Sequence, residues 1–111
     1  MNRLEIALEY HNNLPKGYRF FNWEGRQIFE GRDQVTGSLK ATLVFILMKG
    51  DPLYGGSFGK AGFHQGGNST WFVSETDYNE TINLDTNQLR ELFKKKIQEA
   101  IKSIQDHEKQ D

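Results

Sequence analysis

The chain of 111 residues contains no cysteine. This absence excludes disulfide bonds, cysteine nucleophiles and metal sites built on cysteine thiolates. Long apolar runs are missing too, since the longest, from Ala41 to Met48, has the length of a strand and falls far short of the roughly 20 residues that span a membrane. The first residues lack the basic and then apolar pattern of a signal peptide. Together these absences predict a cytoplasmic protein without a membrane anchor.

An excess of one charge sign is also absent. Lys and Arg number 14 and Asp and Glu 15, so the formal net charge is −1 and the isoelectric point is near 6.3. Domains that bind duplex nucleic acid usually carry a basic excess, so duplex nucleic acid is not an expected partner. The size fits a single domain over residues 1–111.

A C-terminal amphipathic helix is the clearest element that is present. Apolar residues recur at three- and four-residue spacing, at Leu89, Leu92, Phe93, Ile97, Ala100, Ile101 and Ile104. Asp85, Thr86 and Asn87 precede them and are suited to cap a helix N-terminus. The pattern predicts one long helix over about residues 86–106.

Strand patterns fill most of the remaining chain. They predict a hairpin of residues 18–23 and 27–30, strands at 39–48 and 69–74, and a short strand at 81–84. Residues 3–10 alternate as in a strand, although Leu4 and Leu8 are also spaced as in a helix, and we take the strand interpretation. The predicted fold is therefore α+β, with an antiparallel sheet of about five strands packed by one long C-terminal helix.

Residues 43–48 are apolar at every position, which predicts a central strand covered on both faces. One helix covers only one face of a sheet. The N-terminal segment or a second subunit would have to cover the other face, so a homodimer or higher homo-oligomer is one expectation.

A Gly-rich stretch over residues 53–68 is the first candidate for a binding loop. Glycine lets backbone N–H groups approach an anion, and aromatic rings can stack on a base. The side chains interleaved with these glycines include Tyr54, Phe58, Lys60, Phe63 and His64. The alternative is a plain connection whose aromatic rings pack over the sheet.

Three further residues complete the predicted ligand site. Trp71 follows the Gly-rich stretch, and exposed tryptophan is frequent at binding hot spots. Arg90 and Lys96 fall within or beside the apolar sector of the predicted helix, where a cation could receive an anionic ligand. Their stems could equally pack on the sheet while the charge reaches water.

Catalytic signals are sparse. His11, His64 and His107 share no spacing typical of a metal site, so no metal and no cofactor is expected. His64 alone, in the Gly-rich stretch, is a candidate acid or base. No nucleophile elbow or dinucleotide fingerprint is present, so an enzyme is the less favoured class and no catalytic residue is assigned.

These observations predict a small non-enzymatic binding protein. It would sequester or inhibit a small anionic, nucleotide-like ligand or a protein partner, as an inhibitor, an immunity protein or a phage-type counter-defence protein does. Two alternatives stay open: a single-stranded nucleic-acid-binding protein that uses the sheet aromatics, and a small hydrolase or lyase that uses His64.

Overall fold

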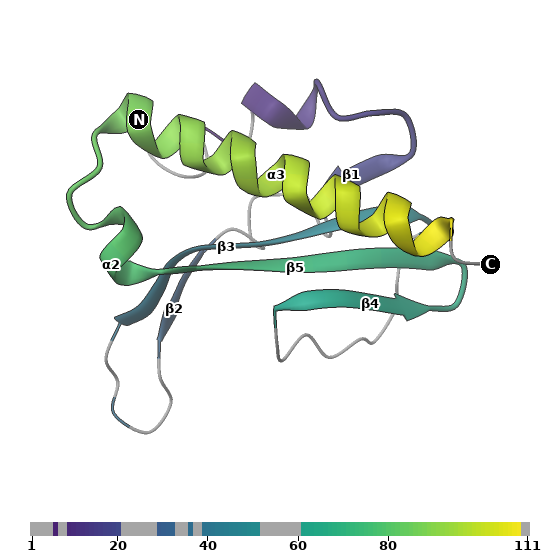
Figure 1. Ribbon diagram of the computed structural model, residues 1–111, viewed down its shortest axis with the longest axis horizontal. Helices are drawn as coiled ribbons and strands as arrows, with labels where there is room; N and C mark the ends of the chain where they lie inside the picture. Colours follow the sequence, from purple (N-terminus) through teal and green to yellow (C-terminus); the bar gives the residue numbers. More distant parts are fainter. Residues whose placement is uncertain are drawn as a thin grey trace.

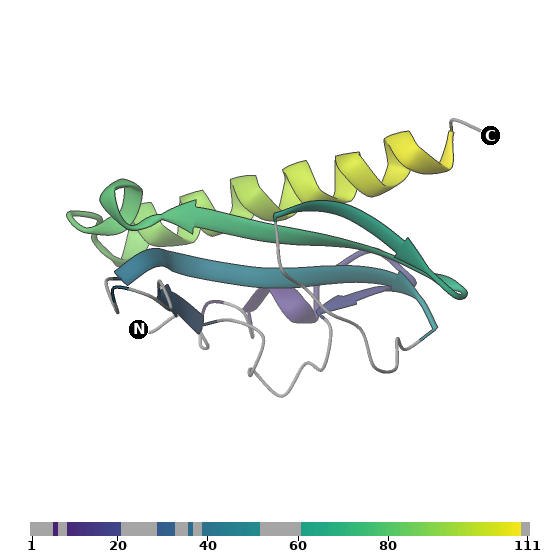
Figure 2. The ribbon, with the colours of Figure 1, turned by 90° about the horizontal axis from the view of Figure 1, so that it is seen from below.

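The computed structural model describes residues 6, 9–20, 29–32, 36, 39–51 and 61–109. Within them the elements follow in the order β1 (Tyr18–Phe20), β2 (Phe29–Arg32), β3 (Leu39–Gly50), β4 (Gly62–Gly66), β5 (Ser69–Asp77), α2 (Tyr78–Thr81) and α3 (Thr86–Glu108). All strand pairs are antiparallel, and α3 lies along one face of the sheet (Figures 1 and 2). The predicted α+β class is confirmed.

The sheet is four strands wide, not five as predicted. One edge of β3 pairs with β5, and β5 continues to β4. The other edge of β3 is shared, because β1 pairs with its residues 47–49 and β2 with its residues 39–44. The 12 residues of β3 are long enough for β1 and β2 to lie end to end along them. The described ends of the predicted hairpin, residues 18–20 and 29–30, each pair with β3, and residues 21–28 lie outside the described part of the chain.

The apolar run in β3 lies in two hydrophobic clusters, as a strand buried on both faces requires. Leu43, Phe45 and Leu47 point to the α3 side, where they pack with the buried face of the helix. Ile46 and Met48 point the other way, against Trp71 and Val73 of β5. All of these side chains are buried within the single chain, so covering the second face does not by itself require another subunit.

The sequence predicted α3 closely. It begins at Thr86 and ends at Glu108, two residues beyond the expected end. A capping box fixes its start: the Asp85 side chain accepts from the Gln88 amide, and the Gln88 side chain accepts from the Asp85 amide. Among the described residues no helix is both long and apolar enough to cross a membrane.

The strand interpretation of residues 3–10 was wrong. Ile6 and residues 9–11 are helical. Ile6 and Tyr10 are one helical turn apart, so both reach the core: Ile6 is fully buried, and the Tyr10 ring stacks on Phe93 at 5.6 Å between centroids. The helical backbone of the described residues overturns the strand interpretation, and residues 3–5, 7 and 8 lie outside the described part of the chain.

The second half of the Gly-rich stretch is not a loop. Residues 62–66 form β4, and Gly67 and Asn68 connect it to β5, with Gly66 and Ser69 paired across the turn. Gly67 has a φ of +57°, which a tight hairpin turn of this kind demands. Residues 53–60 lie outside the described part of the chain. The short strand predicted at 81–84 is also absent, since Thr81 ends helix α2 and residues 82–85 form the connection to α3.

The folded state should lose stability as the pH rises above 10. Burial raises the pKa of the Tyr10 and Tyr18 phenols above 10.0. The hydrogen bond from Lys49 Nζ to Glu108, 2.9 Å long, raises the pKa of Lys49 above 10.5. All three shifts favour the protonated form in the folded chain. Their contribution to the free energy of unfolding is therefore complete below pH 10 and is lost as the pH rises through the raised pKa values.

Urea unfolding measured from pH 8 to pH 11 checks this expectation through the denaturation midpoint. The double variant Tyr10→Phe, Tyr18→Phe lacks both phenols, so its midpoint should fall less steeply with pH than that of the parent. An equally steep fall in both proteins would show that these phenols are not the cause.

Candidate functional site

β4 forms the end of the sheet in the described part of the chain, beyond β5. Gly66 and Ser69 flank the two-residue turn and face each other, and the residues that flank such a turn are hydrogen-bonded to each other. Because hydrogen-bonded and non-bonded pairs alternate, His64 bonds to β5, whereas the backbone groups of Phe63 and Gln65 point away from it. We call these outward groups of Phe63 and Gln65 the β4 edge.

On the α3 side, the side chains of β4 contact the last turns of the helix. The rings of Phe63 and His107 have centroids 4.0 Å apart with 31° between their planes. Gln65, two positions along and therefore on the same side of the strand, has its Oε1 atom 2.7 Å from Nε2 of His107. These contacts fasten the end strand of the sheet to the C-terminal end of α3.

On the opposite side of β4, His64 stacks on Trp71. Their ring centroids are 5.6 Å apart and their planes are 14° from parallel. Trp71 belongs to the second hydrophobic cluster and is only 7% exposed, so its predicted exposure was wrong. Trp71 packs with apolar side chains of β3 and with the ring of His64, and it offers little open surface to a ligand.

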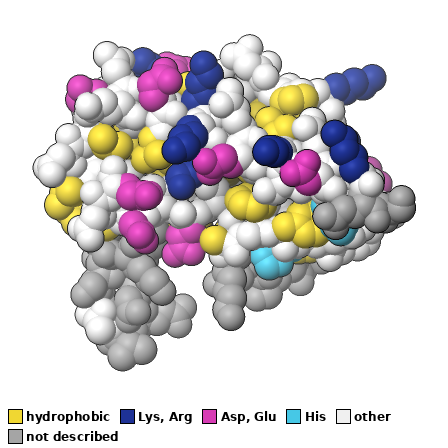
Figure 3. Space-filling model, in the orientation of Figure 1, with side chains coloured by type: hydrophobic (Ala, Val, Ile, Leu, Met, Phe, Trp, Pro, Cys, Tyr) yellow, Lys and Arg dark blue, Asp and Glu magenta, His cyan; other side chains and the backbone are white. Residues whose placement is uncertain are grey.

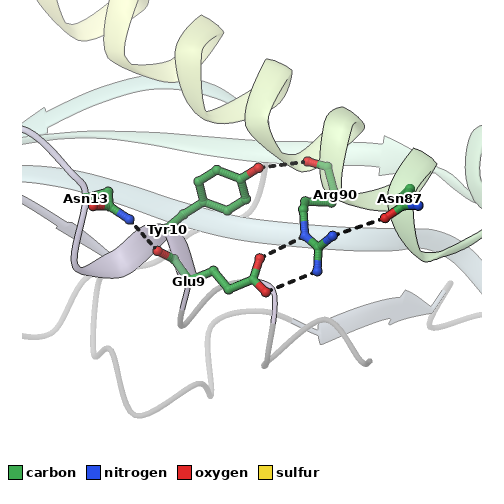
Figure 4. Close-up of polar contacts among 5 residues, drawn as sticks. All are labelled: Glu9, Tyr10, Asn13, Asn87 and Arg90. Carbon is green, nitrogen blue, oxygen red and sulfur yellow. Dashed lines mark hydrogen bonds and ion pairs between the residues drawn. The ribbon is translucent and has the colours of Figure 1, made fainter.

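Arg90 lies elsewhere, near the start of α3, and its guanidinium is already engaged (Figure 4). Its Nε and Nη2 atoms donate to the two carboxylate oxygens of Glu9 at 2.8 and 3.1 Å, and Nη1 donates to Asn87 at 3.1 Å. The Tyr10 hydroxyl donates to the Arg90 carbonyl oxygen at 3.4 Å. Arg90 therefore joins the N-terminal segment to α3. The ion pair is partly exposed, so its contribution to stability is small.

The structure thus brings together only part of the predicted site. Phe63, His64 and Trp71 lie at one end of the sheet. Arg90 is separated from His107, which contacts Phe63, by about 25 Å along the helix axis at the usual rise per residue. Lys96 is half-buried on α3 between these ends. Tyr54, Phe58 and Lys60 lie outside the described residues.

Sequence reasoning missed Gln65 and His107, although both had a signal. The apolar stripe of α3 continues from Ile104 to His107 at three-residue spacing, so His107 should face the sheet as Ile104 does. Gln65 lies two residues from Phe63 and shares its side of a strand, but that relation was hidden while the stretch was interpreted as a loop.

The charges on the α3 face do not form a basic groove. Lys and Arg side chains alternate with Asp and Glu over the visible surface of the helix (Figure 3). Histidine side chains lie beside hydrophobic ones at the end of the molecule where β4 and the C-terminal end of α3 meet (Figure 3). In the described part of the chain no group of three or more His, Cys, Asp or Glu could hold a metal ion.

Comparison with known proteins adds no assignment. The chain matches no protein-family model, no curated protein and no solved structure. The interpretation of the β4 end of the sheet rests on its own geometry.

Proposed function

We propose that this chain is a non-enzymatic binding protein that takes an extended segment of a partner protein at the β4 edge. The observation that supports this is the position of β4 at the end of the described sheet, with backbone donors and acceptors of Phe63 and Gln65 facing outward. An extended segment can add to such an edge as one more strand, gaining affinity from main-chain hydrogen bonds. An inhibitor, immunity or counter-defence protein would mask its target in this way.

A protein segment suits this end of the molecule better than a small anionic ligand. Binding a nucleotide-like anion needs a cation beside the aromatic rings. Of the predicted cations in the described part of the chain, Arg90 is held by Glu9 at the far end of α3 and Lys96 lies midway along the helix. Strand addition needs no charge. It needs backbone groups in register and shallow side-chain contacts on each side of the strand, which Phe63 and His64 supply.

The two other functional classes find less support in the same geometry. Single-stranded nucleic acid is bound in basic grooves with exposed rings, whereas the α3 face is mixed in charge and Trp71 is buried. A hydrolase or lyase that uses His64 would need a pocket for substrate beside the ring, and this ring stacks on the indole of Trp71.

A displayed library of random 12-residue peptides, selected against the purified chain, tests the proposal. Selected peptides should bind the parent and the variant Gln65→Ala, which keeps the backbone N–H of residue 65. They should lose at least tenfold in affinity for Gln65→Pro, which removes that outward N–H while leaving the inward bonds of β4 to β5 intact. The alanine variant is the matched control because both substitutions remove the side-chain contact with His107.

Two results would contradict the proposal. One is a library that yields no binder to a protein whose circular dichroism shows it to be folded. The other is a set of binders that bind Gln65→Pro as tightly as Gln65→Ala, because such peptides would contact a different surface.

A further inference from the structure

We infer that the β4 edge also pairs with the β4 edge of a second copy of this chain, about a two-fold axis that passes beside His64. The inference rests on the same edge as the proposed function. It adds that self-association and partner binding compete for that edge.

The outward groups of β4 are complementary to themselves. Phe63 and Gln65 each present one N–H and one C=O, and they lie symmetrically on either side of His64. Turning a second strand by 180° about His64 places Phe63 against Gln65 of the partner subunit, and Gln65 against Phe63 of the partner subunit. Each N–H then faces a carbonyl oxygen, which is the pattern that a two-fold, isologous interface requires.

The composition of β4 also permits this pairing. Its five residues, Gly-Phe-His-Gln-Gly, include no Asp, Glu, Lys or Arg, so two antiparallel copies bring no permanent like charges together. The glycines at both ends present no side chain that would block a neighbouring strand. The two faces of the sheet would continue from one subunit to the other across the dimer interface.

The two ends of the sheet differ in how they are protected. Beyond β3, the edge is divided between β1, which is only 3 residues long, and β2, which pairs with two register shifts. Short and irregular edge strands both discourage a further strand from adding. The pairing of β4 with β5 runs from Gly62 to Gly66 without a shift. β4 contains no proline, lysine or bulge, which are the usual devices that prevent edge-to-edge association.

Cysteine cross-linking tests both the dimer and its register, and the lack of any natural cysteine makes each cross-link unambiguous. In the inferred dimer, residue 64 lies directly opposite residue 64 of the partner subunit. Their Cα atoms would be about 4.5 Å apart, within the range that a disulfide accepts. The variant His64→Cys should therefore form a disulfide-linked dimer in a glutathione redox buffer.

Residue 65 provides the matched control. It lies opposite residue 63 of the partner subunit, about 8 Å from its own counterpart, which is too far for a disulfide. Gln65→Cys alone should form at least fivefold less linked dimer than His64→Cys. A mixture of Gln65→Cys with Phe63→Cys should form the crossed dimer as readily as His64→Cys forms its own.

Sedimentation equilibrium on the unsubstituted chain provides a second measurement that does not depend on any variant folding. We expect a weak, concentration-dependent dimer, because an interface of one short strand per chain buries little surface. A monomer up to several hundred micromolar, or linked dimers in equal yield from Gln65→Cys and His64→Cys, would overturn the inference. Peptide binding by a strictly monomeric chain would leave the proposed function standing and reject the dimer. A register-specific dimer formed by a chain that selects no peptide would support the dimer and reject the proposed function.

Discussion

Replacing Phe93 with alanine should lower the free energy of unfolding by about 3–5 kcal/mol. Phe93 is fully buried, and its ring contacts three others, from Tyr10, Phe20 and Phe45, with centroids 5.3 to 5.9 Å apart. These rings come from the N-terminal segment, β1 and β3, so one truncation removes contacts that join three parts of the fold to α3. Domains of this size are stable by about 5–15 kcal/mol, so the change removes a large part of the total.

Urea denaturation followed by circular dichroism would measure this effect. Ile82→Ala is the control, because Ile82 is 51% exposed and its truncation should change stability by less than about 0.5 kcal/mol. A loss of under 1 kcal/mol for Phe93→Ala would mean that the aromatic cluster does not hold the helix to the sheet.

Replacing Gly50 with alanine should destabilise the fold by roughly 2–5 kcal/mol, from strained backbone and forced close packing together. Gly50 ends β3 with a φ of +110°, a conformation that side chains other than glycine rarely adopt. A Cβ atom there would collide with the carbonyl oxygen of Asn68 and lie 3.1 Å from Cα of Ser69. Both are backbone atoms, one in the β4–β5 turn and one in the first residue of β5, which pairs with Gly50.

Gly62→Ala separates these two contributions. Gly62 has a similar positive φ, of +122°, but no atom lies within 4 Å of where its Cβ would be. Its substitution should therefore show the backbone strain alone, on the order of 1–3 kcal/mol. Equal losses at the two positions, in thermal or urea unfolding, would show that the close approach of Gly50 to the turn has no energetic weight.

The elements that the sequence predicted well are those whose pattern is long and has one interpretation. The seven apolar positions of α3 repeat over many turns, and a capping residue precedes them. The run from Leu43 to Met48 indicated a strand buried on both sides, and five of its six residues divide between the two clusters. In both cases packing reinforces the local preference, so sequence and tertiary structure agree.

The elements that were missed have short or weak patterns. β4 contains two glycines, a histidine and a glutamine, none a strong strand former, and its pairing with β5 makes it a strand. The N-terminal segment has apolar residues at a spacing compatible with both strand and helix. Its packing beside α3 decides between them, and α3 lies some 80 positions away in the sequence.

The candidate site was predictable only in part for the same reason. Phe63 and His64 were found because they neighbour glycines, which marked the stretch as unusual. The contact of β4 with the end of α3 was not found, since His107 is 42 positions from Gln65 and no local pattern connects them. The predicted association of Arg90 with the aromatic residues treated the helix as a single face, and the length of α3 separates them.

The arrangement of the core has a consequence for how the chain is made on the ribosome. The rings of Phe20 and Phe45 pack on Phe93, and the helix that carries Phe93 is synthesised after all five strands. Until α3 is synthesised, the apolar side of the sheet that carries Phe20 and Phe45 lacks the helix that covers it, for several seconds at ordinary rates of elongation. A chain whose sheet has formed before α3 docks is therefore prone to aggregation through this apolar side.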